Sequence, residues 1–216
     1  MIGVDLDCTL IDSEQLYRDE LEMAERYGIS QEEYVAAIQK LKQRYGTVAY
    51  RFEILYEILT EVNPGLPRQI IEDLNALLDK NYFFPDSEEF LASFGREQLV
   101  LITSGNADFQ ARKIAAHGLK TYVNCIWVIS DKALAVGAEI VSAAKAGIQE
   151  PFFFISVAPR EIEAVRIAHP EVTCIQVRTP ASWETQRSTE YFDVHLPDLL
   201  AARDYIKGRL AAAKFK

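Results

Sequence analysis

Five short apolar runs predict the buried strands of one sheet. They span residues 2–6, 99–103, 122–129, 152–157 and 172–177. Helical patterns separate the last four runs, which is typical of a parallel sheet covered by helices on both faces. The pattern therefore predicts an α/β fold built on a Rossmann-like parallel sheet.

The gap between the first two runs is far longer than a sheet crossover requires. A parallel crossover needs about a dozen residues, whereas roughly 90 residues separate these runs. Inside the gap, apolar residues recur every three or four positions, which is the period of helices. These positions are Val35, Ile38, Leu41 and Tyr45, then Val48, Phe52, Leu55, Leu59 and Val62, then Ile70, Ile71, Leu74, Leu77 and Leu78. With residues 13–27 in front, they predict an inserted bundle of four helices.

Turn-forming residues place the boundaries of this insert. Glycine or proline interrupts the pattern at Gly28, Gly46 and Pro64, and Ser30 is suited to cap a helix. We expect residues 13–84 to form a helical cap domain. Residues 1–12 and 85–216 then form the α/β core domain.

The composition of the chain limits which classes of molecule it is expected to bind. The chain has 216 residues, of which 49% are hydrophobic, and a net charge of −9, which disfavours nucleic acid and anionic membrane surfaces. No apolar run reaches the roughly 18 residues of a membrane span, and no secretory leader is visible. The three cysteines, Cys8, Cys125 and Cys174, lack metal-site spacing. These features predict a cytoplasmic protein.

Two carboxylates follow the first apolar run. Alternation along an extended chain places Asp5 and Asp7 on the same side, with Leu6 on the other. Carboxylates at the end of a central buried strand are costly unless a cation or a chemical task requires them. In an open parallel sheet the carboxyl ends of the strands form the ligand crevice. The alternative is that both acids are solvated at the start of a loop.

A second candidate segment follows the run at residues 99–103. The sequence Thr103-Ser104-Gly105-Asn106 leads from a strand into a helix. Hydroxyls and free backbone N–H groups at such a turn suit a phosphate. The same residue types are also common helix caps, so this segment alone is a weak signal.

Together these segments resemble a known family. Residues 5–13, Asp-Leu-Asp-Cys-Thr-Leu-Ile-Asp-Ser, resemble the first motif of the haloacid dehalogenase superfamily, in its capped phosphoglycolate-phosphatase-like branch. Thr103 resembles the hydroxyl of the second motif. Residues 85–91 resemble the segment that re-enters the core, so the similarity covers essentially the whole chain.

The resemblance implies a phosphomonoester phosphatase acting on a small phosphorylated metabolite. Asp5 would form an aspartyl-phosphate, Asp7 would act as acid and base, and Thr103 would hold a phosphoryl oxygen. It further implies a Mg²⁺ ion held by Asp5, the backbone carbonyl of Asp7 and Glu161. The other residues expected to bind phosphate are Thr9, Ser104, Gly105 and Asn106.

The third motif of the family is a lysine. Lys132 is the best match, because it stands just beyond the third apolar run and ahead of a helical stretch at residues 133–146. The family often has proline directly after this lysine, where this chain has Ala133. Lys145 is the competing candidate, but its pattern fits a helix surface.

The fourth motif departs from the family pattern. Val157 stands where a metal-binding aspartate is expected, and Glu161 occupies the second acidic position. Three interpretations follow: a weakened metal-dependent phosphatase, a catalytically degenerate binding or structural protein, or a metal-independent dehalogenase-like hydrolase. Ser156 favours the third, because it resembles the dehalogenases' fourth motif. Asp7 disfavours it, because those enzymes usually lack an acid there.

Within the cap, four side chains are candidates for contacting the distal part of a substrate. They are Arg18, Arg44, Tyr50 and Arg51. The alternative for each arginine is a solvated position on a helix surface.

Overall fold

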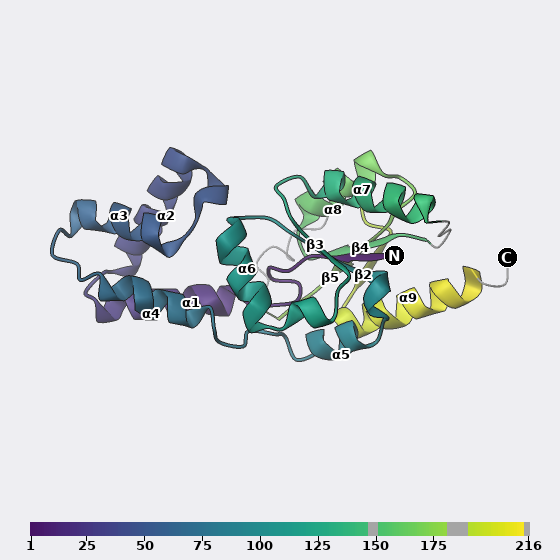
Figure 1. Ribbon diagram of the computed structural model, residues 1–216, viewed down its shortest axis with the longest axis horizontal. Coiled ribbons are helices and arrows are strands. Elements are labelled where there is room, and N and C mark those ends of the chain that lie inside the picture. The colour runs from purple at the N-terminus through teal and green to yellow at the C-terminus, as the bar shows by residue number, and fades with distance from the viewer. Residues whose placement is uncertain (147–150, 181–189, 214–216) are drawn as a thin grey trace. The chain divides into compact units, whose positions relative to one another are not determined.

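The computed structural model describes residues 1–146, 151–180 and 190–213, and it contains a parallel sheet (Figure 1). The sheet has six strands in the order β3-β2-β1-β4-β5-β6. Their bounds are β1 Ile2–Val4, β2 Leu99–Thr103, β3 Cys125–Val128, β4 Phe153–Ser156, β5 Thr173–Val177 and β6 Val194–Leu196. The predicted Rossmann-like α/β sheet is confirmed. The short strand β6 was not predicted, since three half-buried residues give too little apolar signal.

Strand β1 lies between the two halves of the sheet. Gly3 pairs in parallel register with Val100 of β2 and with Phe154 of β4. A Cβ atom on Gly3 would stand 3.1 Å from Cδ1 of Ile102 and 3.3 Å from Cε1 of Phe152. Glycine at this position therefore lets neighbouring side chains close over the central strand.

Two pairs of helices cover the sheet. Figure 1 shows α7 (Lys132–Lys145) and α8 (Pro159–Ala168) on one face, and α5 (Ser87–Ala92) and α9 (Leu199–Ala213) on the other. The core between the sheet and the first pair consists of buried apolar side chains. It comprises Val100, Ile102, Ala133, Ala135, Val136, Phe152, Phe154, Ile162, Val165, Val172 and Cys174. Strands β2, β4 and β5, with the residues just before β4 and β5, contribute alternate residues, as a two-sided sheet requires.

The chain forms two compact units. One contains residues 1–12, 83–103 and 119–216, and the other contains residues 13–82 and 104–118. The second unit holds α1 (Ser13–Arg26), α2 (Gln31–Tyr45), α3 (Phe52–Val62), α4 (Gln69–Leu77) and α6 (Ala107–Ala116). From its position in the sequence, α6 was expected to belong to the core domain. In the structure Phe109 of α6 instead packs edge-on against Tyr50 and Phe52, with ring centroids 5.3 and 5.2 Å apart.

Local signals explain where the inserted helices begin and end. The Ser30 hydroxyl accepts a hydrogen bond from the N–H of Glu33, whose carboxylate accepts one from the N–H of Ser30. The helix predicted from Val48 begins four residues later, after a 3₁₀ turn at Thr47–Ala49. Tyr45, Val48 and Val62 were predicted to face the core but are exposed, because each lies at the end of its periodic run. None of the described helices is long and apolar enough to span a membrane.

The chain leaves the core unit and returns to it at one place. Ile11 forms an antiparallel bridge with Phe83, and the N–H of Phe84 donates to the carbonyl of Leu10. The hydroxyl of Ser87 donates to the same carbonyl. Both ends of the insert are thus fixed to each other by hydrogen bonds within the core unit.

A tight turn follows β1 and carries backbone strain. The N–H groups of Thr9, Leu10 and Ile11 all donate to the carbonyl of Leu6. Cys8, inside this turn, has a φ of 58°, a left-handed conformation that disfavours residues with a Cβ atom. The turn therefore keeps Cys8 in a backbone conformation that cysteine disfavours.

Replacing Cys8 by glycine should stabilise the protein. Relief of the strained φ should exceed the extra entropy of glycine in the unfolded chain, giving a gain of about 0.5–1 kcal/mol in the free energy of unfolding. Cys8→Ala is the matched control, since it removes the thiol but keeps Cβ. Urea denaturation of both variants measures the difference, and equal stability of the two would contradict the strain.

The helical unit buries one carboxylate among tyrosines. Oε2 of Glu20 accepts hydrogen bonds from the hydroxyls of Tyr34 at 3.1 Å and Tyr50 at 2.7 Å. Burial raises the pKa of Glu20 to about 7, although the two tyrosine hydroxyls and the charge of Lys113 oppose the shift. The folded unit thus binds a proton that the unfolded chain releases near pH 4.5.

The stability of the helical unit should fall as the pH rises from about 4.5 to 7. A raised pKa in the folded state favours folding fully below the unfolded value, and this contribution is lost through the folded value. Glu20→Gln, which stays neutral, should lack this dependence, and the difference from wild type should reach about 3 kcal/mol. Urea denaturation at pH 5 and pH 8 measures it. Identical pH profiles would show that Glu20 does not titrate in this range.

Candidate active site

The site is built around Asp5, the residue that follows β1. Its N–H donates to the carbonyl of Ile155 at 3.0 Å, so the backbone of Asp5 continues the sheet. The residue is 2% exposed. Oδ1 accepts from the N–H of Leu6 at 2.7 Å, and Oδ2 accepts from the hydroxyl of Thr9 at 3.1 Å. The sheet thus fixes the carboxylate at the carboxyl end of its central strand.

Lys132 supplies the cation of the site. Its ammonium forms an ion pair and hydrogen bond with Oδ1 of Asp5, and it lies 2.7 Å from Oε1 of Glu161. The Lys132 side chain is 5% exposed. Lys132 is the first residue of α7, whose N-terminus is capped by the side chain of Asp131. Of the two candidate lysines, the structure therefore brings Lys132 to Asp5, while Lys145 lies exposed at the end of α7.

Ser156 and Glu161 close a ring around this ion pair. The Ser156 hydroxyl lies 2.8 Å from Oε2 of Glu161 and 3.4 Å from Oδ2 of Asp5. It also accepts from the N–H of Ala158 at 3.0 Å. Ser156 was singled out in the sequence only for its resemblance to the dehalogenases' fourth motif. Its position at the end of β4, the strand beside β1, is the signal that places it next to Asp5.

Burial shifts the acid–base equilibria of the ring. Desolvation and the charge of Glu161 raise the pKa of Asp5 to about 7, against the opposing effect of Lys132. Burial alone would lower the pKa of Lys132, but the charges of Asp5 and Glu161 raise it overall. Lys132 therefore stays protonated, and the proton exchanged near neutral pH belongs to Asp5.

Asp7 does not lie on a continuing strand as alternation predicted, whereas Thr9, for which phosphate binding stays a prediction, contacts Asp5. The strand ends at Val4, so Asp7 lies in the turn rather than on a continuing strand, where it is half-buried and bridges to Ile11. Its charge still contributes to the raised pKa of Asp5. Thr9 is fully buried, donates to Asp5 and accepts from the N–H of Val157 at 3.3 Å. Thr9 therefore supports Asp5 directly.

Thr103 ends the strand on the other side of β1. The residue is fully buried, and its hydroxyl has no hydrogen-bond partner within residues 1–146, 151–180 and 190–213. A buried hydroxyl without a partner is costly in a folded protein. This is the geometry expected of a group that bonds to a ligand.

The next three residues, Ser104, Gly105 and Asn106, were predicted to bind phosphate and belong to the helical unit. The carbonyl of Ser104 accepts from Nε2 of Gln110 at 2.6 Å. Gly105 has a φ of 129°, which favours glycine. The side-chain oxygen of Asn106 accepts from the N–H of Phe109 at 3.2 Å and so caps α6. These contacts explain the turn, and a phosphate-binding role for these residues stays a prediction.

The donor atoms around Asp5 fit a magnesium ion poorly. Asp5 and Glu161, the two carboxylates expected to bind it, are bridged by the ammonium of Lys132. Val157 is 2% exposed and offers no carboxylate. The described residues contain no cluster of three or more His, Cys, Asp or Glu side chains suited to a metal. The donor set thus fits an ammonium better than Mg²⁺, which needs a near-octahedral shell of oxygens.

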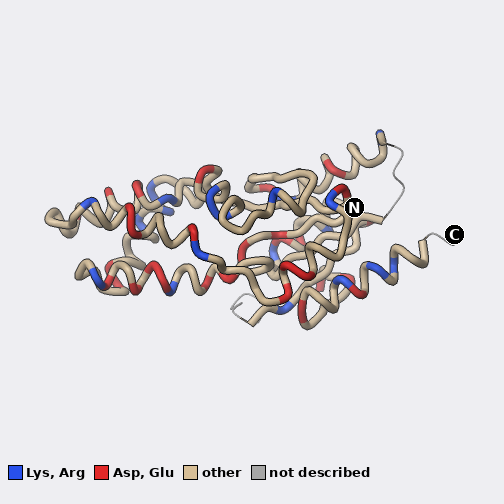
Figure 2. The backbone as a smooth tube through the Cα atoms, turned by 60° about the horizontal axis from the view of Figure 1, so that its bottom comes forward, with Lys and Arg blue, Asp and Glu red and all other residues tan. Residues whose placement is uncertain are grey.

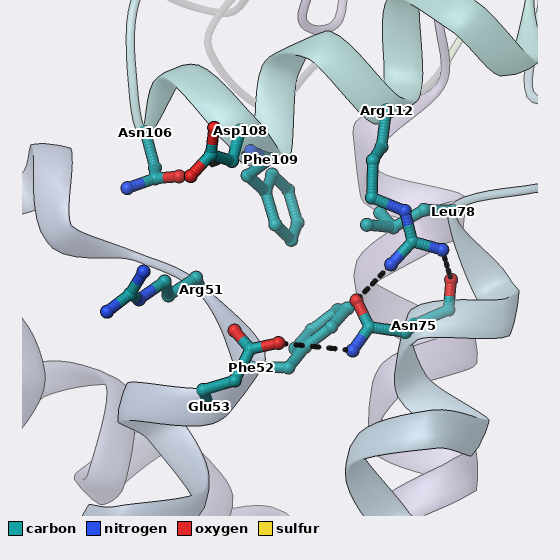
Figure 3. Close-up of a pocket in the computed structure, with 9 residues that line it drawn as sticks. All are labelled: Arg51, Phe52, Glu53, Asn75, Leu78, Asn106, Asp108, Phe109 and Arg112. Carbon is teal, nitrogen blue, oxygen red and sulfur yellow. Dashed lines mark hydrogen bonds between the residues drawn. The ribbon is translucent and has the colours of Figure 1, made fainter.

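Of the four cap candidates, three have partners inside the helical unit. Arg44 pairs with Glu61, Arg18 bonds Gln15, and Tyr50 bonds Glu20. The fourth, Arg51, lines a cavity of about 150 Å³ within this unit (Figure 3).

The cavity walls come from α3, α4 and the start of α6. In Figure 3 Arg112 reaches across to Asn75, whose side-chain and backbone oxygens both accept from its guanidinium. The other residues around Arg51 are Phe52, Glu53, Leu78, Asn106, Asp108 and Phe109. The charged side chains have both signs, as they do along the helices of both units in Figure 2.

Comparison with solved structures identifies the fold. A protein from Burkholderia xenovorans LB400, described as a haloacid dehalogenase-like hydrolase, superposes with a TM-score of 0.70 at 18% identity, over 95% of this chain and 94% of that one. The chain has the haloacid dehalogenase-like fold. A haloacid dehalogenase-like family hydrolase from Xanthomonas campestris matches with a TM-score of 0.62 at 21% identity, over 99% and 92% of the chains.

Dehalogenases are among the structures with this haloacid dehalogenase-like fold. The L-2-haloacid dehalogenase from Xanthobacter autotrophicus, with chloropropionic acid covalently bound, matches with a TM-score of 0.62 at 14% identity, over 96% and 98% of the chains. Neither a protein-family model nor a curated protein matches the sequence. The predicted resemblance to haloacid dehalogenase-like hydrolases is confirmed at the level of the fold.

The carboxyl group of Asp5 should titrate near pH 7, and Glu161→Gln should lower its midpoint. The substitution removes a negative charge beside Asp5 and leaves Lys132 paired with Asp5 alone, and both changes favour the carboxylate. Carbon-13 NMR of labelled aspartate measures the midpoint. Glu163→Gln on the same helix is the control and should leave it unchanged. An unshifted midpoint in Glu161→Gln would mean that Glu161 does not act on Asp5.

Proposed function

We propose that the chain is a hydrolase in which Asp5 forms a covalent intermediate, and that the substrate is a small phosphomonoester, which would make this intermediate an aspartyl-phosphate. The observation that carries this proposal is the confinement of Asp5, which both Lys132 and Thr9 hold in place at the end of β1. Carboxylates that form covalent intermediates require such orientation.

The phosphate chemistry rests on Asp7 and Thr103. An oxygen of Asp5 attacks phosphorus, and the phosphorus–oxygen bond to the leaving group breaks with its electron pair. The carboxyl group of Asp7 gives its proton to the leaving oxygen, and the resulting carboxylate then takes a proton from the water that attacks phosphorus. That attack releases Asp5 and inorganic phosphate. The buried hydroxyl of Thr103 is suited to hold one phosphoryl oxygen.

Displacement at carbon is the second candidate, and the ring of Lys132, Ser156 and Glu161 favours it. There an oxygen of Asp5 attacks a carbon atom, and halide leaves with the bonding electrons. Water then attacks the ester carbonyl of Asp5 while Glu161 takes its proton, and the acyl–oxygen bond breaks. The alkyl oxygen leaves with the bonding electrons, takes up a proton and departs as the hydroxylated product, which regenerates the Asp5 carboxylate. This route needs no acid for the leaving group and adds less negative charge to a site rich in carboxylates.

Asp5→Asn should abolish turnover while the fold is kept. The amide is a far weaker nucleophile, so the rate should fall by at least about a hundredfold. Phosphate release from para-nitrophenyl phosphate and halide release from 2-chloropropionate identify the chemistry, with circular dichroism as the check on folding. Asp204→Asn, an exposed aspartate on α9, is the matched control.

The two assays separate the candidates. Phosphate release that depends on Asp5 supports the phosphatase, and halide release that depends on Asp5 supports displacement at carbon. If wild type and Asp5→Asn give the same rate with both substrates, Asp5 is not a nucleophile and the proposed function is wrong.

A further inference from the structure

The ammonium of Lys132 occupies the point where a divalent cation would be needed. A cation serving Asp5 and Glu161 together must lie between their oxygens. Nζ of Lys132 hydrogen-bonds Oδ1 of Asp5 and lies 2.7 Å from Oε1 of Glu161. An ammonium has three donors, so two are satisfied by these carboxylates.

The remaining oxygens of the two carboxylates are also engaged by protein donors. The N–H of Leu6 shares Oδ1 of Asp5 with Lys132, and the hydroxyl of Thr9 bonds Oδ2. The Ser156 hydroxyl lies 2.8 Å from Oε2 of Glu161. A metal would have to displace at least one of these contacts inside a buried ring, where each lost hydrogen bond is costly.

The fourth strand offers no replacement ligand at the expected position. The side chain of Val157 has no oxygen, and both polar backbone atoms of this residue are used within the core. Its N–H donates to the Thr9 hydroxyl at 3.3 Å, and its carbonyl accepts from Nε2 of Gln176 at 3.2 Å. Val157 thus stabilises the turn that follows Asp5 through its hydrogen bond to Thr9.

The backbone fixes Lys132 firmly enough to act as a permanent charge. The Asp131 carboxylate caps α7 by accepting from the N–H of Leu134 at 3.2 Å. Ala133, Ala135 and Val136 anchor the first turns of this helix in the core. The lysine stem therefore starts from a fixed point of the helix, although ordering its four-carbon chain in the ion pair still costs side-chain entropy.

We propose that Lys132 replaces the divalent metal of this site, so that the protein binds its substrate and acts without Mg²⁺. The ammonium carries one positive charge where Mg²⁺ would carry two, so Asp5 and Glu161 together keep one unit of negative charge. This inference rests on the proposed function only in taking Asp5 as the reacting group.

Magnesium titration of the apo-protein tests the replacement. Wild type should show no heat of Mg²⁺ binding. Its melting temperature should not rise at Mg²⁺ concentrations up to about 10 mM. Lys132→Met keeps the stem but removes the charge, leaving two carboxylates facing each other. This variant should melt lower than wild type and gain about 3 °C or more on adding Mg²⁺ at ten times its Kd. Lys145→Met, at the exposed end of α7, is the control and should behave as wild type.

Val157→Asp keeps the test decisive if Lys132→Met does not fold. It adds a third carboxylate while Lys132 remains, and it should lower the melting temperature without producing Mg²⁺ binding. Magnesium binding to wild type that is lost in Asp5→Asn would overturn the proposal. So would a Val157→Asp protein that binds Mg²⁺ with Lys132 in place.

Activity provides a separate readout. With whichever substrate is turned over, the rate in excess EDTA should equal the rate in Mg²⁺, and a loss of more than about tenfold in EDTA would contradict the replacement. Absence of turnover with every substrate would reject the proposed function alone, because the calorimetric and melting results on wild type and Lys132→Met stand independently of it.

Discussion

The ion pair between Asp5 and Lys132 is the interaction on which the arrangement of the site depends. A unit charge pair at 4 Å contributes about 4 kcal/mol at an effective dielectric of 20, and desolvation opposes much of this gain. Burial of both side chains is therefore tolerable only while each keeps its partner. Glu161 and Ser156 complete that requirement by occupying the donors and acceptors that remain. The position of β1 between β2 and β4 brings these side chains to one edge of the sheet.

Most of the fold was predictable because its signals are local. Apolar runs located five of the six strands, and three- and four-residue periodicity located the inserted helices. The site was predictable in part: the resemblance pointed to Asp5, Asp7 and Lys132, but their protonation and pairing depend on burial. Apart from its resemblance to the dehalogenases' fourth motif, Ser156 gives no sequence signal, since a serine at a strand end is common. Its role emerges only from the register of β4 beside β1.

The largest difference between the prediction from the sequence and the structure is the unit to which residues 104–118 belong. The segment at residues 104–118 follows a core strand, so its sequence position assigned it to the core. The packing of Phe109 on Tyr50 and Phe52 instead joins it to the inserted helices. Long-range aromatic contacts of this kind carry no periodic signature. Likewise, alternation along β1 predicted that Asp7 would continue the strand, but the turn closed by the carbonyl of Leu6 ends it earlier.

The hydrogen bonds that join the two ends of the insert affect how freely the insert can change in length. Phe84 and Ser87 both bond the carbonyl of Leu10, so the excursion between them starts and finishes at one point of the core. The cost of closing such a loop grows only slowly with its length. A module of a different size can therefore occupy the same place with little penalty to the sheet. The two segments that join the insert to the core form a constant attachment site, and the helices between them can be replaced by another inserted domain.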